Sequence, residues 1–298
     1  MFLLISKSDS LLAGIIERER IPVVHSNKVT QIDGALAAYA THRAHVWHIH
    51  ENLIGNTDLT LPLLTRTTIE RTISHLSNRI VGVSETLLRQ GYPYLWKSVQ
   101  AIVVYNGLDL NLFQPNSQAK KQLSDELGFN ANMPVVAIIG GLRKVKNQPI
   151  FLKAAALMKS KAIFLIIGEG PEREHLQQMA MTLGIGSAVL FLEERDDIAR
   201  IMPAMNLLAV SSRSEAFPNT VIKAMAAGIP VVATRCGGIS ESVLDGKTGL
   251  LVDVNAAEAM TLAMDKLLQN PELAAQYGRA GRERAANLFL GWIYTYRA

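Results

Sequence analysis

The sequence contains a single cysteine, Cys236, among its 298 residues. One thiol excludes an internal disulfide and is typical of a protein kept in a reducing compartment. No apolar run reaches the eighteen or so residues that a membrane-spanning helix needs. The apolar start, Met1 to Ile5, has no positive charge before it and polar residues after it, so it does not resemble a secretory signal. These absences lead us to expect a cytoplasmic protein.

The sequence also has little net charge and no strip in which basic and aromatic residues alternate. Its 30 basic and 26 acidic residues leave a charge of +4. This balance does not favour nucleic acid as a partner, and it permits only weak peripheral contact with an anionic membrane, here the inner face. The G-x-G-x-x-G fingerprint is absent, and neither Gly140-Gly141 nor Gly168-Glu169-Gly170 substitutes for it. We therefore predict no nicotinamide or other cofactor.

Apolar segments with the pattern of strands alternate with helical segments along the chain. This order predicts an α/β fold with parallel sheets and right-handed crossovers, and the length favours two domains. In the first part, strands are expected at 23–25, 44–50, 79–84 and 101–105, and helices at 1–20, 35–41, 61–76 and 85–90. In the second part, strands are expected at 135–139, 162–167, 188–192, 207–210, 229–233 and 249–252, and helices at about 147–159, 171–183, 197–204, 218–227, 255–268 and 271–287.

The most informative stretch runs from Ser211 to Asp253 and reads as loop, helix, strand and glycine turn. Pro218 suits the first turn of the helix, where its missing N–H has no partner, and Gly228 suits its end. The helix start provides N–H groups for a phosphate, and Glu215 just before it suits sugar hydroxyls. The spacing alone is compatible with two interpretations: a binding site for a phosphorylated sugar, or an ordinary βα unit with polar loop residues.

This stretch resembles the donor-site signature of glycosyltransferase family 4, the retaining enzymes of the GT-B architecture. Two positions depart from the family pattern: Ala216 replaces a usual glycine, and Lys223 replaces the second glutamate of the Glu-x7-Glu motif. The matching positions are Ser211 or Ser212, Glu215, Phe217, Pro218, Asn219, Ala224, Met225, Ala226, Gly228, Pro230, Gly237, Gly238, Glu241, Asp245, Gly246 and Gly249.

The resemblance implies two Rossmann-like domains that face a cleft. Asn106-Gly107-Leu108-Asp109 and Phe113-Gln114-Pro115 are similar to the interdomain connection. We therefore expect a first domain over 1–112, a nucleotide-sugar domain over 113–280, and a C-terminal helix over 281–298 that returns to the first domain. Family members usually begin with a strand and a glycine-rich turn, which do not precede Ile21 here. We accordingly expect an incomplete first domain with an exposed sheet edge.

The resemblance also implies roles for individual residues, without a metal. Lys146 would hold the diphosphate of the donor. Gly141 stands where the family usually has an arginine, and Arg143, two residues further on, would reach the same phosphate in its place. The alternative interpretation is that Arg143 is a solvated charge of the loop. Glu215 would bind sugar hydroxyls, and His50 would lie near the transferred sugar, unless it is a plain strand-end histidine. The remaining donor-binding positions are Gly168, Glu194, Ala216, Phe217, Pro218, Asn219, Thr220, Lys223, Gly238 and Glu241.

Lys223 decides between two expectations for activity. An ammonium group has three donors and no acceptor, so it does not replace a carboxylate that accepts hydrogen bonds from ribose hydroxyls. We expect donor binding to be weakened roughly tenfold to a hundredfold. The leading hypothesis is a retaining transferase that moves a hexose from a UDP- or GDP-sugar to a glycan, lipid or small acceptor. The alternative is a non-catalytic protein of the same fold that binds a nucleotide or a partner.

Overall fold

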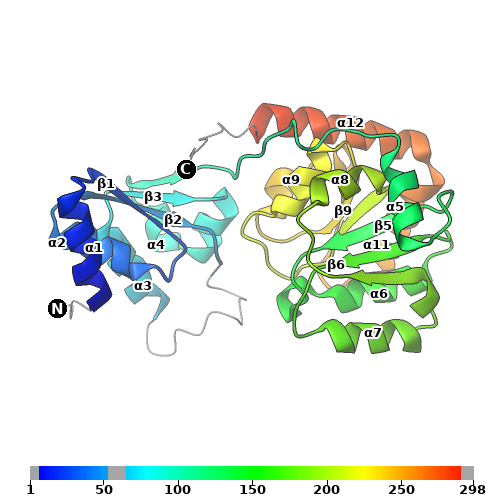
Figure 1. Cartoon of the computed structure of the whole chain (residues 1–298), viewed down its shortest axis with the longest axis horizontal. Coiled ribbons are helices and arrows are strands. Elements are labelled where there is room, and N and C mark those ends of the chain that lie inside the picture. The colour runs from blue at the N-terminus through cyan, green and yellow to red at the C-terminus, as the bar shows by residue number, and fades with distance from the viewer. Residues whose placement is uncertain (1–6, 53–64, 290–298) are drawn as a thin grey trace. The chain divides into compact units, whose positions relative to one another are not determined.

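The computed structural model describes residues 7–52 and 65–289. The chain divides into two units, Met1–Tyr105 and Asn106–Ala298 (Figure 1). The division falls just before the segment that resembles the interdomain connection, whereas the predicted boundary lies after residue 112. Each unit contains its own parallel sheet.

Unit 1 is a four-stranded parallel sheet with strands in the order β1-β2-β3-β4. The central strand β2 pairs with β1 through Ser26 opposite Trp47 and with β3 through Trp47 opposite Ile80. Trp47 and Ile80 are buried in the core of this unit. The elements are α1 (Lys7–Arg18), β1 (Val23–Asn27), α2 (Ile32–Ala40), β2 (Ala44–Ile49), α3 (Arg66–Leu76), β3 (Arg79–Gly82), η1 (Leu87–Gly91), α4 (Pro93–Trp96) and β4 (Ala101–Val103).

The helix predicted at 85–90 is instead a single π-helical turn, η1. Burial of Leu87, Leu88 and Tyr92 accompanies this wider turn, so packing here prevails over local preference. The following helix α4 was not predicted. Buried Glu70 on α3 accepts hydrogen bonds from the first N–H groups of α4, those of Tyr94 and Leu95. A carboxylate at a helix N-terminus stabilises the unpaired N–H groups there.

Unit 2 is a six-stranded parallel sheet in the order β10-β9-β8-β5-β6-β7. The strand order reverses between β5 and β8, which is the topological switch point of a Rossmann-type sheet, where ligands bind beyond the carboxyl ends of the strands. The strands are β5 (Val135–Ile139), β6 (Ile163–Ile167), β7 (Val189–Leu192), β8 (Leu207–Val210), β9 (Val231–Thr234) and β10 (Gly249–Val252).

Helices cover both faces of this sheet (Figure 1), which explains why its strands are nearly continuous apolar runs. On one face, Val136, Phe164 and Leu207 pack with Phe151 and Met264 from two of the helices. The helices are α5 (Ala119–Leu127), α6 (Gln148–Leu157), α7 (Arg173–Thr182), α8 (Ile198–Ile201), α9 (Asn219–Ala226), α10 (Ile239–Ser242), α11 (Ala257–Gln269) and α12 (Pro271–Leu288), with short 3-10 turns at Lys144–Lys146, Gly186–Ala188 and Met202–Ala204.

One helix of unit 2, α5, was not predicted. Its apolar residues Ala119, Leu123 and Leu127 recur every four residues, but Leu123 is its only fully buried large apolar residue. Helix α12 agrees with the helix predicted at about 271–287, and residues 290–298 of the C-terminal segment lie outside the described residues. Across the described ranges, none of the helices is both long and apolar enough to cross a bilayer.

Candidate functional site

The loops that follow β5 and β8 meet at the switch point of unit 2. The N–H of Arg213 donates to the carbonyl oxygen of Val145 at 2.8 Å, and the Ser211 hydroxyl donates to the carbonyl oxygen of Lys146 at 3.0 Å. These bonds join two loops that are more than sixty residues apart in the sequence. They place polar side chains from both loops at the one edge of the sheet where a ligand is expected.

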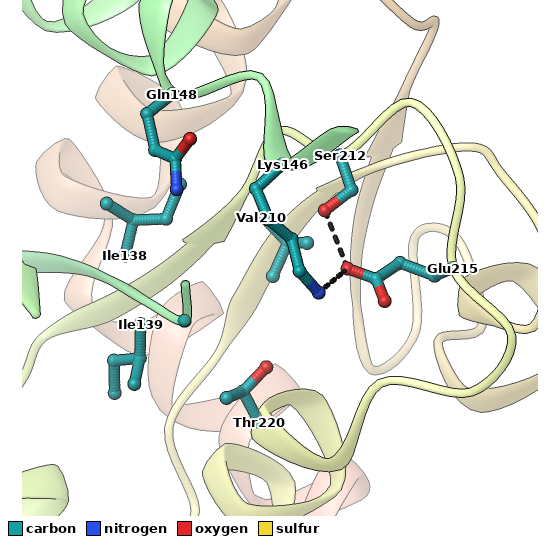
Figure 2. A pocket seen from close by; sticks show the side chains of 9 residues that line it. Ile138, Ile139, Lys146, Gln148, Val210, Ser212, Glu215 and Thr220 are labelled. Carbon is teal, nitrogen blue, oxygen red and sulfur yellow. Dashed lines mark hydrogen bonds and ion pairs between the residues drawn. The ribbon is translucent and has the colours of Figure 1, made fainter. Parts of the chain in front are cut away.

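An ion pair connects the two loops. The Lys146 ammonium donates to Oε1 of Glu215 at 2.7 Å, and the Ser212 hydroxyl donates to the same oxygen at 2.6 Å (Figure 2). The Lys146 side chain is 33% exposed and the Glu215 side chain 11% exposed, so the pair is accessible from one side. Within the described part of the chain, no hydrogen bond is made to Oε2 of Glu215. The carboxylate is therefore oriented through one oxygen, and its other oxygen has no hydrogen bond from the described residues.

Glycines bring the backbone of neighbouring loops into close contact at this edge. A Cβ atom at Gly237 would overlap the carbonyl oxygen of Glu215, and one at Gly238 would overlap that of Ala216. Gly237 also has a φ of 48°, in the left-handed region that favours glycine. A Cβ atom at Gly168 would likewise overlap the carbonyl oxygen of Gly140. Side chains at these positions would force apart the loops that carry the site.

Helix α9 begins beside the ion pair. Pro218 is the residue just before the helix and not its first residue, so the expected position is shifted by one, within the usual variation of helix ends. Phe217 is buried and packs edge-to-face on Phe289 at 5.4 Å. Thr220 lines the cavity that also contains Lys146 and Glu215, and Asn219 accepts a hydrogen bond from Asn106 at 2.8 Å. The start of α9 is thus anchored on both sides.

Arg143 lies beside the backbone of Gly141. A Cβ atom at Gly141 would lie 3.7 Å from Nε of Arg143, which is ordinary van der Waals contact. The side chain of Arg143 therefore runs past the place where a side chain from position 141 would start. Arg143 is an exposed residue.

The other predicted donor-binding residues lie on neighbouring strand ends. Gly168 follows β6, and Glu194 is an exposed residue after β7. Next to it, Arg195 is held by Glu126 and Asp197 at 2.6 and 2.7 Å, and the hydrogen bonds of that cluster lower the pKa of Asp197. Glu241 lies in α10, where its carbonyl oxygen accepts a hydrogen bond from Arg284.

Lys223 lies one turn after Asn219 on α9 and is partly buried. Its ammonium nitrogen is 5.8 Å from the ring centroid of Phe113, a cation–π distance. The carbonyl oxygen of Phe113 in turn accepts a hydrogen bond from Arg282 at 2.9 Å. The Lys223 side chain therefore packs on an aromatic ring.

His50 belongs to unit 1, at the end of β2, and it lies in a group of histidines. Its ring centroid is 4.1 Å from that of His48, and His48 stacks on His25 at 5.5 Å. The Nε2 atoms of His48 and His50 are buried and have no hydrogen-bond partner among the described residues. Burial lowers the pKa of His48 to about 4, and the neighbouring His50 and His25 rings add to this effect. Burial also lowers the pKa of His50, partly offset by Glu51.

Sequence reasoning missed two polar residues of the unit 2 site. Ser212 orients Glu215, and Gln148 lines the same cavity from the start of α6. Ser212 was noted only as a match to the motif, and Gln148 carried no signal because its position is not part of it. In the parts of the chain that are described, no group of three or more metal-ligating side chains is present.

The chain matches known proteins over most of its length. It is 27% identical over 290 residues to N-acetyl-alpha-D-glucosaminyl L-malate synthase of Bacillus anthracis, covering 94% of this chain and 74% of that protein. It is 36% identical over 194 residues to D-inositol 3-phosphate glycosyltransferase of Mycobacterium marinum, covering 62% of this chain and 41% of that protein. The chain thus spans less than half of the second relative.

The fold also matches solved structures. HepE of Anabaena in complex with UDP-glucose matches with a TM-score of 0.84 at 24% identity, over 94% of this chain and 78% of that one. The two parallel sheets of the present chain therefore follow the GT-B architecture, and the first sheet is the smaller. The family described as "Glycosyl transferases group 1" matches residues 119–284, which is more than half of the chain. This protein belongs to that family, the family 4 glycosyltransferases, which are retaining enzymes that use nucleotide sugars.

Proposed function

We propose that this chain transfers a hexose from a nucleoside diphosphate sugar to a glycan, lipid or small acceptor, with retention of configuration. The observation that carries the proposal is the Lys146–Glu215 ion pair at the switch point between β5 and β8, beside the start of α9. A cation and the unpaired N–H groups of a helix start stabilise charge that develops on a leaving diphosphate. A carboxylate next to them accepts hydrogen bonds from sugar hydroxyls.

In this proposal Lys146 and the first N–H groups of α9, at Asn219 and Thr220, bind the diphosphate. Oε2 of Glu215 binds the transferred sugar while its Oε1 stays on Ser212. Arg143 contributes the second cation from its position beside Gly141. The remaining predicted positions, Gly168, Glu194, Ala216, Phe217, Pro218, Gly238 and Glu241, line the donor site mainly through backbone groups.

For unit 1 we propose that His50 contacts the transferred sugar. Its buried Nε2, which has no partner among the described residues, supports a neutral imidazole that exchanges a hydrogen bond with a hydroxyl group. The donor class favoured is a UDP-sugar, because HepE, which shares this fold, was crystallised with UDP-glucose; a GDP-sugar is the other donor to test. We place the reaction in the cytoplasm, with peripheral membrane contact where the acceptor is a lipid.

Nucleotide binding without transfer is a second candidate function. The observation that favours it is Lys223, whose ammonium packs on Phe113 at the position where the family has a carboxylate for the ribose.

The test is calorimetric titration of the purified chain with UDP, GDP, UDP-glucose and GDP-mannose. We expect one nucleotide and its sugar to bind with a stoichiometry of one. Release of the nucleotide in an acceptor screen, with NMR of the product showing retention, supports transfer over binding alone. If circular dichroism shows a folded α/β protein and none of the four ligands binds, both functions are wrong.

A further inference from the structure

Gln148 is the first residue of α6, and it lines the small cavity that contains Lys146, Glu215 and Thr220 (Figure 2). It is 2% exposed. Its Nε2 donates to the carbonyl oxygen of Gly141 at 3.0 Å. Its Oε1 is also buried, yet accepts no hydrogen bond from any residue of the described ranges. One end of this amide is therefore satisfied and the other is not.

The bond to Gly141 determines which end lacks a partner. Turning the amide around would bring Oε1 against the carbonyl oxygen of Gly141, so that two acceptors would face each other. The unsatisfied group of Gln148 is consequently an acceptor, and the partner that it lacks is a hydrogen-bond donor. Buried acceptors without a partner are uncommon in folded proteins and require a specific explanation.

No described residue that lines the cavity donates to Oε1 of Gln148. The Lys146 ammonium and the Ser212 hydroxyl, the polar donors nearest to the carboxylate, both point to Oε1 of Glu215. Ile138, Ile139 and Val210 line the apolar part. A diphosphate does not provide a donor either, because its oxygens are ionised acceptors at neutral pH. A sugar hydroxyl is both donor and acceptor, and therefore suits Oε1.

We propose that Gln148 binds the donor substrate by accepting a hydrogen bond from a hydroxyl of the transferred sugar. This inference rests on the proposed function, since it places the sugar in the cavity that Lys146 and Glu215 share. Gln148 adds a neutral acceptor to a site whose other acceptor, Glu215, is charged. A neutral acceptor forms a hydrogen bond with a hydroxyl group and adds no charge near the diphosphate. Gln148 therefore contributes to the selection of sugars that have a hydroxyl group at this position.

The experiment measures the sugar gain, which we define as the Kd of the nucleotide divided by the Kd of its sugar conjugate. UDP and UDP-glucose are titrated into the full chain, or GDP and GDP-mannose if the wild type binds GDP. Gln148→Met keeps the length of the side chain and removes the acceptor. Gln148→Glu keeps acceptor oxygens at the same place and loses Nε2. Gln177→Met, at an exposed position of α7, is the matched control.

We expect Gln148→Met to lower the sugar gain about fivefold while the Kd of the nucleotide stays within about twofold. Gln148→Glu should retain the sugar gain, because its negative charge weakens the binding of nucleotide and conjugate by the same factor. Gln177→Met should match the wild type. Gln148→Ala, which removes the same acceptor, takes the place of the Met variant if circular dichroism shows that the latter does not fold.

Three results would overturn the inference while leaving the proposed function intact. In the first, the sugar gain of Gln148→Met equals that of the wild type. In the second, nucleotide and conjugate weaken by the same factor, which means that Gln148 does not contact the transferred sugar. In the third, Gln148→Glu loses the sugar gain as well, which assigns the effect to Nε2. A wild type that binds no nucleotide removes the proposed function, and this inference with it.

Discussion

In unit 1 the polar side chains at the end of β2 are histidines that burial keeps neutral, whereas in unit 2 those after β5 and β8 are a lysine and a glutamate that form an ion pair. A neutral imidazole can be buried without a partner at moderate cost, but a buried charge needs a counter-charge. The unit 1 group therefore suits uncharged hydroxyls. The unit 2 site suits a ligand that carries negative charge and hydroxyls together.

Lys146→Met tests the charged side of this comparison and has the largest expected effect. This substitution removes the ammonium group that would bind the diphosphate, and it leaves the Glu215 carboxylate without its counter-charge in the site. We expect nucleotide-sugar affinity to fall about a hundredfold, as measured by calorimetry. Lys144→Met is the matched control, because Lys144 is exposed in the same loop. Equal losses in the two variants would mean that the positive charge of the loop in general, and not Lys146 in the ion pair, determines the affinity.

Lys223→Glu sharpens the comparison, because it adds an acceptor to the charged site. We expect nucleotide affinity to rise about tenfold, since a carboxylate accepts hydrogen bonds from ribose hydroxyls. The free energy of unfolding should fall by about 0.5–1 kcal/mol, because the contact with Phe113 is lost.

Lys223→Met separates these two effects. It loses the cation–π contact and gains no acceptor, so its stability should fall while nucleotide affinity stays well below that of Lys223→Glu. If the two variants bind the nucleotide equally, position 223 does not contact the ribose, and Lys223 serves only to hold the segment that contains Phe113.

Lowering the pH tests the neutral histidines of unit 1. The pKa values of His45 and His48 are lowered from 6.5 to about 4 by burial. Between pH 6.5 and 4 the unfolded chain therefore binds more protons than the folded chain, so stability is full above about pH 6.5 and falls as the pH drops. In unit 2 the groups with a lowered pKa that titrate in acid are carboxyls such as Glu126, whose ordinary value is 4.5. Their contribution is lost only below that value.

Hydrogen exchange at pH 7.5 and pH 5 separates the units. After correction for intrinsic rates, amides of β1 and β2 should exchange about fivefold faster at pH 5, and those of β5 and β8 should not change. His48→Phe keeps a flat ring without a titrating nitrogen and should reduce this effect. Equal changes in both units would show that the histidines do not set the acid response.

Much of the fold follows from local patterns. The strands at 135–139, 207–210 and 249–252 have their predicted bounds, because parallel strands covered on both faces are unbroken apolar runs. The missed elements are those whose stability comes from distant partners. Helix α4 depends on Glu70, η1 on the burial of Tyr92, and α5 on a single buried leucine.

The candidate site divides in the same way. The ordered motif from Ser211 onward and the register of Lys146 predict the family and two residues of the candidate site, Lys146 and Glu215, and the comparisons confirm the family. The motif does not indicate that these two residues pair, that Ser212 fixes one carboxylate oxygen, or that Gln148 faces the same cavity. Each of these contacts joins residues from separate segments of the chain, and no local pattern encodes them.

By itself, the sequence determines the α/β class, the family and the residue types available for a phosphorylated sugar, because periodicity and motif spacing are local properties of the chain. The tertiary structure decides the rest. Strand order places the loops after β5 and β8 at the one edge where the sheet reverses direction. Packing then determines which polar atoms keep a partner and which, like Oε1 of Gln148, remain for a ligand.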